Sequence, residues 1–98
     1  MAFRISWTET AAHDLRGIVE FINLANPDAA QRLAELILSK IENLTKLPKL
    51  GRVVPEKNDS NIRELVLSPY RIIYHVEQEH KILHITRIWH SARGIPEL

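Results

Sequence analysis

Arginine and histidine side chains recur between residues 61 and 90, and both residue types suit chemistry on a phosphate. An arginine guanidinium binds phosphate oxygens through paired hydrogen bonds. A histidine imidazole exchanges protons near neutral pH. If these side chains share one surface, we expect them to bind RNA or to cut it, with arginine stabilising the charged transition state. The competing interpretation is a solvated strand surface. The candidates are Arg71, His75, His84 and His90, with Arg63 or Glu64 from the neighbouring strand.

A metal site or a bound cofactor is not expected. The chain has no cysteine, and His84 and His90 are too far apart along one predicted strand to hold a metal together. The sequence contains no glycine-rich phosphate loop, no nucleophile elbow and no evident pair of catalytic carboxylates.

Three short apolar runs must position these residues. Ile62–Leu67, Tyr70–Val76 and Ile82–Trp89 are rich in branched and aromatic residues and are separated by turn formers, which predicts strands. Because the links between them are short, we expect an antiparallel meander. Alternation then directs one set of side chains towards the core and the other set to the opposite face. The core set is Tyr70, Ile72, Tyr74 and Val76, and the opposite set is Arg71, Ile73 and His75.

The last predicted strand does not alternate cleanly. Strict alternation would put His84 and His90 on one side, together with Thr86 and Ile88. It would put Arg87 on the other, more apolar side, beside Trp89. The sequence therefore indicates either a β-bulge in this strand or a position for Arg87 at its end.

The first half of the chain reads as a strand and two helices. Phe3–Trp7 alternates as a short strand. Thr8 can cap a helix running to about Asn23, in which Gly17 is expected to pack closely against a neighbour. Asn26 can cap a second helix that ends near residues 47–48. Pro48–Ser60 is predicted to be a loop, in which residues 52–54 could pair briefly with a strand.

These elements predict one α+β domain over residues 1–98, in the order β-α-α-β-β-β. The helical hairpin is expected to pack on one face of a four-stranded, mainly antiparallel sheet, with the first strand beside a later one. The other face of the sheet would be open. The residues expected to be buried between helices and sheet are Trp7, Ile37, Ile72 and Tyr74.

Charge is nearly balanced over the whole chain but unevenly distributed. The net charge is +1, which argues against a strongly electrostatic nucleic-acid binder. Residues 8–45 carry six acidic and three basic side chains, whereas residues 46–98 carry nine basic and six acidic ones. No apolar run is long enough to span a membrane, and the start of the chain has no export signal. We therefore expect a cytoplasmic protein with no membrane partner.

The predicted order of elements and three segments together resemble the RelE/ParE superfamily. These are the toxins of type II toxin–antitoxin modules, often labelled plasmid stabilisation proteins. The resemblance covers nearly the whole chain. The segments are LPKLGR (Leu47–Arg52), RELVLSPYRIIY (Arg63–Tyr74) and RIWHSARG (Arg87–Gly94).

The resemblance implies one of two activities. RelE-type members cut mRNA in the ribosomal A site, whereas ParE-type members poison DNA gyrase without being enzymes. By resemblance, Arg71 and His90 fall where some ribonuclease members keep a phosphate-binding arginine and an acid histidine. Those ribonucleases tend to be strongly basic, but here the sequence pI is ≈ 8.2. Lys81 is the sole lysine of the strand region, and no tyrosine follows His90. The pattern is nearer the ParE branch.

If the protein is a ParE-type gyrase poison, we expect a rim of basic side chains to contact the target. Arg71 and His90 would be catalytic only if the protein is a ribonuclease. The rim residues are Arg52, Arg63, Arg87 and Arg93. The resemblance implies a cognate antitoxin as partner, laid along the helical hairpin and the sheet edge. The target would be DNA gyrase or, alternatively, the ribosome with its mRNA. A homodimer or a heterotetramer with the antitoxin is the expected assembly, and an inert or retargeted family member is the third possibility.

Overall fold

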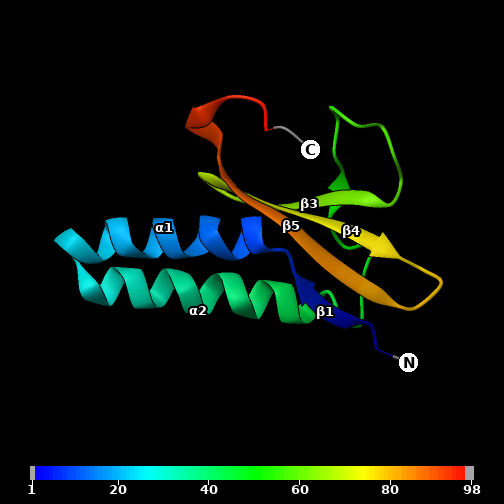
Figure 1. Ribbon diagram of the computed structural model, residues 1–98, viewed down its shortest axis with the longest axis horizontal. Helices are drawn as coiled ribbons and strands as arrows, with labels where there is room; N and C mark the ends of the chain where they lie inside the picture. The colour runs from blue at the N-terminus through cyan, green and yellow to red at the C-terminus, as the bar shows by residue number, and fades with distance from the viewer. Residues whose placement is uncertain (1, 97–98) are drawn as a thin grey trace.

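The computed structural model describes residues 2–96 and contains two long helices packed against one sheet. In Figure 1 the helices lie below the sheet, and the loop before the third strand and the segment after the last strand rise above it. The helices are α1 (Glu9–Ala25), α2 (Pro27–Asn43) and the short 3-10 helix η1 (Ser91–Arg93). The strands are β1 (Arg4–Trp7), β2 (Arg52–Val53), β3 (Ile62–Leu67), β4 (Tyr70–Glu77) and β5 (Ile82–His90).

The sheet has the strand order β1-β5-β4-β3-β2. Strand β1 runs parallel to β5, and the remaining pairs are antiparallel. The predicted α+β fold, with a helical hairpin on a mainly antiparallel sheet, is confirmed. The sheet has five strands and not four, because Arg52 and Val53 pair with Glu64 and Arg63. This is the brief pairing that the loop sequence allowed.

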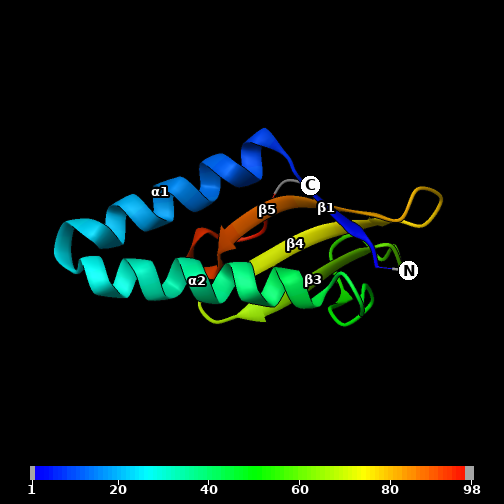
Figure 2. The ribbon, with the colours of Figure 1, turned by 90° about the horizontal axis from the view of Figure 1, so that it is seen from below.

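Side-chain caps determine where the helices begin. The Thr8 hydroxyl accepts a hydrogen bond from the Ala11 amide at 3.1 Å, and the Asn26 side chain accepts one from the Ala29 amide at 3.1 Å. Helix α2 ends at Asn43, earlier than predicted, because the Thr45 hydroxyl donates to the Glu42 carbonyl at 2.8 Å in a following turn. Figure 2 shows the hairpin joined at one end, with its helices spreading apart towards the sheet. Among the described residues, no helix has the length and apolar content needed to cross a membrane.

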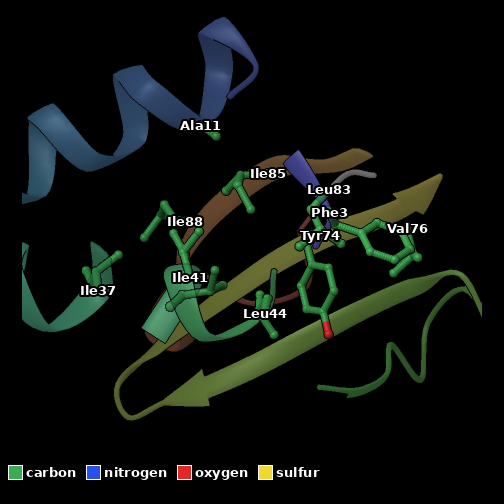
Figure 3. Packing of buried hydrophobic residues seen from close by; sticks show 11 residues of the cluster. Phe3, Ala11, Ile37, Ile41, Leu44, Tyr74, Val76, Leu83, Ile85 and Ile88 are labelled. Atoms are coloured by element: carbon green, nitrogen blue, oxygen red, sulfur yellow. The ribbon is translucent and has the colours of Figure 1, made fainter. Parts of the chain in front are cut away.

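The core lies between the helices and the inner face of the sheet (Figure 3). Ile37, Ile72 and Tyr74 are fully buried, as predicted. Trp7, also expected to be buried, packs against this core but is only partly buried. The reason is that β1 is an edge strand with a neighbour on one side only. The members of the core cluster are Phe3, Ala11, Ile37, Ile41, Leu44, Ile72, Tyr74, Val76, Leu83, Ile85 and Ile88.

Tyr74 connects this core to the loop that precedes β2. Its hydroxyl donates to the Pro48 carbonyl at 2.7 Å and accepts from the Gly51 amide at 2.9 Å. Burial raises the pKa of this phenol. A Cβ on Gly51 would lie 2.5 Å from the Glu64 carbonyl oxygen and 2.7 Å from the Tyr74 hydroxyl. The close approach of loop and sheet therefore requires glycine at this position.

A β-bulge in β5 determines which side chains share a face. Ile73 pairs with Arg87 and Tyr74 pairs with Ile85, so Thr86 is the extra residue. The Thr86 hydroxyl donates to the Ile73 carbonyl at 3.1 Å. Of the two alternatives left by the sequence, the bulge is correct, and it places Arg87 on the same face as His84.

Gly17 in α1 is not closely packed, so that expectation is wrong. Nothing lies within 4 Å of the position that a Cβ would take. Gly17→Ala is therefore expected to raise the free energy of unfolding by about 1 kcal/mol, because alanine loses less entropy than glycine on entering a helix. Urea titration measures this change. Gly51→Ala is the matched control and should destabilise, and a loss of stability in Gly17→Ala would contradict the structure.

Candidate functional site

The outer face of the sheet, opposite α1 and α2, carries most of the predicted candidates. Cross-strand partners share a face, and the register pairs Arg71 with Trp89, Ile73 with Arg87, and His75 with His84. This face is not fully open as expected. A small apolar cluster covers its centre, formed by Val54, Ile73 and Trp89 with Ile62 against them.

Arg71 and His90 are not brought together. His90 pairs with Tyr70 on the helix-covered side, where the two rings meet edge to face with centroids 5.2 Å apart. His90 also lines a hollow of about 340 Å³ with residues of α1. Its Nδ1 accepts a hydrogen bond from the Ala92 amide at 3.0 Å and so caps η1. The expectation that His90 shares a face with Arg71, His75 and His84 is wrong, because the bulge at Thr86 reverses the alternation beyond it.

Arg71 is buried between two carboxylates. Its Nε donates to Glu64, and its Nη2 donates to Glu56 at 2.8 Å. Glu64 is completely buried and also accepts from Arg52 Nε at 2.6 Å. The hydrogen bonds to Glu56 and Glu64 raise the pKa of Arg71, and the hydrogen bond from Arg71 lowers the pKa of Glu56. The network Arg52–Glu64–Arg71–Glu56 thus balances two positive charges with two negative ones.

The Glu56–Arg71 contact predicts a pH dependence of stability. The folded-state pKa of Glu56 lies below the ordinary value of 4.5, so the contact stabilises the fold above pH 4.5 and is lost as the pH falls through the folded pKa. Glu56→Gln should therefore lower the melting temperature at pH 7 and have a shrinking effect as the solution is acidified. Thermal unfolding between pH 7 and pH 2 measures this. Glu79→Gln, in the exposed β4–β5 turn, is the control, and an effect of Glu56→Gln that is equal at all pH values would contradict the assignment.

The four predicted rim arginines divide into two groups. Arg63 faces the helix-covered side opposite Tyr74 and holds the preceding loop, donating to the Ser60, Lys49 and Gly51 carbonyls at 2.8, 3.2 and 2.9 Å. Arg52 and Arg87 lie on the outer face, whereas Arg93, in η1, packs on Trp89 and also lines the hollow beside α1. The side chain of Arg52 is 62% exposed. The guanidinium carbons of Arg87 and Arg93 lie 4.8 and 4.6 Å from the centre of the Trp89 indole.

Asp14 of α1 fixes Arg87 and was missed by sequence reasoning. Its carboxylate accepts from Arg87 Nε at 2.8 Å, from Arg87 Nη2 at 3.1 Å and from the Ile88 amide at 3.1 Å. The sequence did contain a sign of this role, because Asp14 is an acidic residue beside Ala11 and Leu15 in the apolar stripe of the helix. Glu56 was also missed, and it gave no signal because it lies in an irregular loop.

A second hollow, of about 550 Å³, lies on the outer face. His75 and His84 line it with their rings stacked, centroids 6.1 Å apart and planes inclined by 22°. Beside it, Glu77 accepts from His84 and His80, and these hydrogen bonds lower the pKa of its carboxyl group. Among residues 2–96, no three histidine, aspartate or glutamate side chains are grouped so that they could hold a metal ion.

Comparison with known proteins shows that this sequence is similar to bacterial toxins. Residues 5–95 match the family model for the ParE toxin of the type II toxin–antitoxin system parDE. Toxin RelE2 of Caulobacter vibrioides is 36% identical over 91 residues, covering 92% of this chain and 97% of that protein. Putative toxin Y4kP of Sinorhizobium fredii is 37% identical over 97 residues, covering 97% and 95%.

Solved structures share the fold at lower identity. The chromosomal ParDE system from P. aeruginosa contains a chain that superposes with a TM-score of 0.73 at 24% identity, covering 91% of this chain and 96% of that one. A mutant of E. coli toxin RelE in complex with an antitoxin RelBc peptide gives a TM-score of 0.66 at 15% identity, covering 100% and 99%. With the family match over residues 5–95, these findings establish that the chain belongs to the ParE toxin family of type II toxin–antitoxin systems, within the RelE/ParE superfamily.

Proposed function

We propose that this toxin acts by binding DNA gyrase in the ParE manner, without catalysing a reaction, and that a cognate antitoxin neutralises it. The observation that carries the proposal is the separation of Arg71 and His90 on opposite faces of the sheet. A ribonuclease acting through this pair would need both side chains within hydrogen-bond reach of one phosphate. The sheet backbone lies between them.

The surroundings of the Arg71 guanidinium give further support to the proposal. Its Nε, Nη1 and Nη2 atoms already donate to Glu64 and Glu56, and its side chain is only 11% exposed. A phosphate could approach this guanidinium only by displacing Glu56. Two carboxylates beside the guanidinium would also repel a phosphate.

The proposed contact surface for gyrase is the outer rim formed by Arg52, Arg87 and Arg93. Arg63 is left out, because it supports the loop from the other side of the sheet. Arg93 is the best single probe, since it is exposed and packs on Trp89 without holding a helix in place. Charges at the rim of an interface mainly change the association rate and its dependence on salt.

The exposed surface of the helical hairpin is the proposed binding site for the antitoxin. Phe21 and Leu24, near the end of α1, are 77% and 86% exposed. The helical half of the chain is acidic, so a partner segment with apolar and basic side chains would complement it. A solved relative at 20% identity and a TM-score of 0.61 is the toxin–antitoxin complex RelBE2 from Mycobacterium tuberculosis. A cytoplasmic location, and a homodimer or a heterotetramer with the antitoxin, stay predictions.

Induced expression in a bacterial host tests the proposal. Wild-type protein should arrest growth with DNA breaks while amino-acid incorporation continues, and co-expression of the adjacent antitoxin gene should restore growth. His90→Ala should leave toxicity nearly unchanged. Arg93→Glu should weaken it more, because a reversed rim charge slows association.

Arg32→Glu, on an exposed position of α2, is the matched control for charge reversal. Immediate arrest of amino-acid incorporation without DNA breaks would contradict the proposal and favour the ribosome-dependent ribonuclease. So would a loss of toxicity in His90→Ala protein that remains folded.

A further inference from the structure

The 550 Å³ hollow on the outer face shares Arg87 with the proposed rim, but its other lining residues belong neither to the rim nor to the Arg71 network. Its walls come from four segments of the chain: the start of α1, the beginning of β3, and the paired strands β4 and β5. The lining residues are Thr8, Thr10, Ile62, His75, His84, Thr86 and Arg87. None of them belongs to the Arg52–Glu64–Arg71–Glu56 network.

The β-bulge assembles this hollow. In a regular strand, successive side chains point to alternate faces of the sheet. Arg87 and His84 are three residues apart, so without a bulge they would point to opposite faces. The extra residue Thr86 turns Arg87 to the side of His84 and His75. Bulges that redirect a side chain in this way are concentrated beside functional sites.

One wall of the hollow is suited to a flat ring. The stacked imidazoles of His75 and His84 form a short aromatic column, and Ile62 adds an apolar surface beside them. His84 is held in place by its contact with Glu77 at 3.1 Å. Nucleobases stack on side chains of this kind.

The other wall is suited to an anion. Asp14 occupies Arg87 Nε and Nη2, and among the described residues no acceptor engages Arg87 Nη1. The Thr10 hydroxyl is a second donor on the lining. An arginine fixed by a carboxylate keeps its orientation, so its remaining N–H groups are preorganised for a phosphate oxygen.

We propose that this hollow binds a nucleotide, with the base stacked on His75 and the phosphate held by Arg87 and Thr10. The volume falls in the range of small-molecule sites and exceeds what a bare phosphate needs. The same chemistry could come from a free mononucleotide or from the phosphorylated end of a single strand. Arg87 also belongs to the proposed gyrase rim, but nucleotide binding is measured on the toxin alone and does not depend on that proposal.

Titration with adenosine 5′-monophosphate, followed through the imidazole NMR signals of the histidines, tests the site. We expect the signals of His75 and His84 to shift and those of His13 to stay fixed. Adenosine lacks the phosphate and ribose 5-phosphate lacks the base, so each should bind at least about tenfold more weakly. A 5′-phosphorylated RNA trinucleotide is the second arm. Tighter binding of the trinucleotide would identify a strand end, and tighter binding of the mononucleotide a free nucleotide.

His75→Ala should weaken binding of adenosine 5′-monophosphate about tenfold through loss of stacking. His80→Ala is the matched control, because His80 is exposed in the β4–β5 turn and does not line the hollow. Three results would overturn the proposal: no shift of the His75 and His84 signals with either ligand at millimolar concentration, equal affinity for adenosine and its monophosphate, or unchanged affinity in the His75→Ala protein.

Discussion

Glu64→Ala is expected to lower the free energy of unfolding by about 3–5 kcal/mol. The Glu64 carboxylate is completely buried and accepts hydrogen bonds from both Arg71 and Arg52. Its removal leaves Arg71 buried with Glu56 as the remaining carboxylate partner. A buried guanidinium that loses a carboxylate keeps its desolvation cost and loses the interaction that offset it. Urea titration with fluorescence of Trp89 and Trp7 measures the change.

A double variant separates the cost of breaking this ion pair from the value of keeping it. Glu64→Leu combined with Arg71→Met replaces the pair by apolar side chains and should recover much of the lost stability. Glu79→Ala, at an exposed position, should change stability by less than about 0.5 kcal/mol. A loss below about 1 kcal/mol in Glu64→Ala would mean that the network does not hold Arg71 in solution as it does in the structure.

Ile72→Ala is expected to lower the free energy of unfolding by about 2–5 kcal/mol. Ile72 is fully buried in β4, opposite Ile88 in the register, and belongs to the core cluster with Ile37 and Ile41. Truncation removes three carbon atoms and leaves a cavity that the strand backbone on either side cannot close. Chemical denaturation gives the difference directly.

Val66→Ala is the matched control for Ile72→Ala, because it removes apolar carbon atoms from the neighbouring strand at a position that is 56% exposed. Its effect should stay below about 0.5 kcal/mol. A loss under about 1 kcal/mol in Ile72→Ala would show that the inner face of β4 is wrongly assigned, and with it the position of Arg71 on the outer face.

The parts of the fold that could be predicted are those that follow from strand alternation and from helix-capping residues. Strand β4 alternates without interruption, so Ile72 and Tyr74 were correctly placed in the core and Arg71 on the opposite face. The caps Thr8 and Asn26 gave the starts of both helices. Trp7 was expected to be buried and is only partly so, because periodicity gives the direction of a side chain but not the number of neighbours around its strand.

The candidate site was less predictable, for two physical reasons. The extra residue Thr86 turns every later side chain of β5 to the opposite face of the sheet. His90 therefore lies on the face opposite to Arg71. The carboxylate that covers Arg71 comes from Glu56 in an irregular loop, and no periodic pattern describes the path of such a loop. Arg63 was predicted to be a rim residue, but its guanidinium donates to backbone carbonyls of the preceding loop.

The most direct test of the proposed gyrase mechanism uses the purified protein with two purified targets. Supercoiling of relaxed plasmid by DNA gyrase should be inhibited, with cleaved DNA accumulating, and His90→Ala protein should inhibit nearly as well. mRNA bound in ribosomes should remain uncut in the presence of the same protein, as read by primer extension. Cleavage of that mRNA in the A site with undisturbed gyrase activity, and its loss by about 10²–10⁴ in His90→Ala protein, would contradict the account.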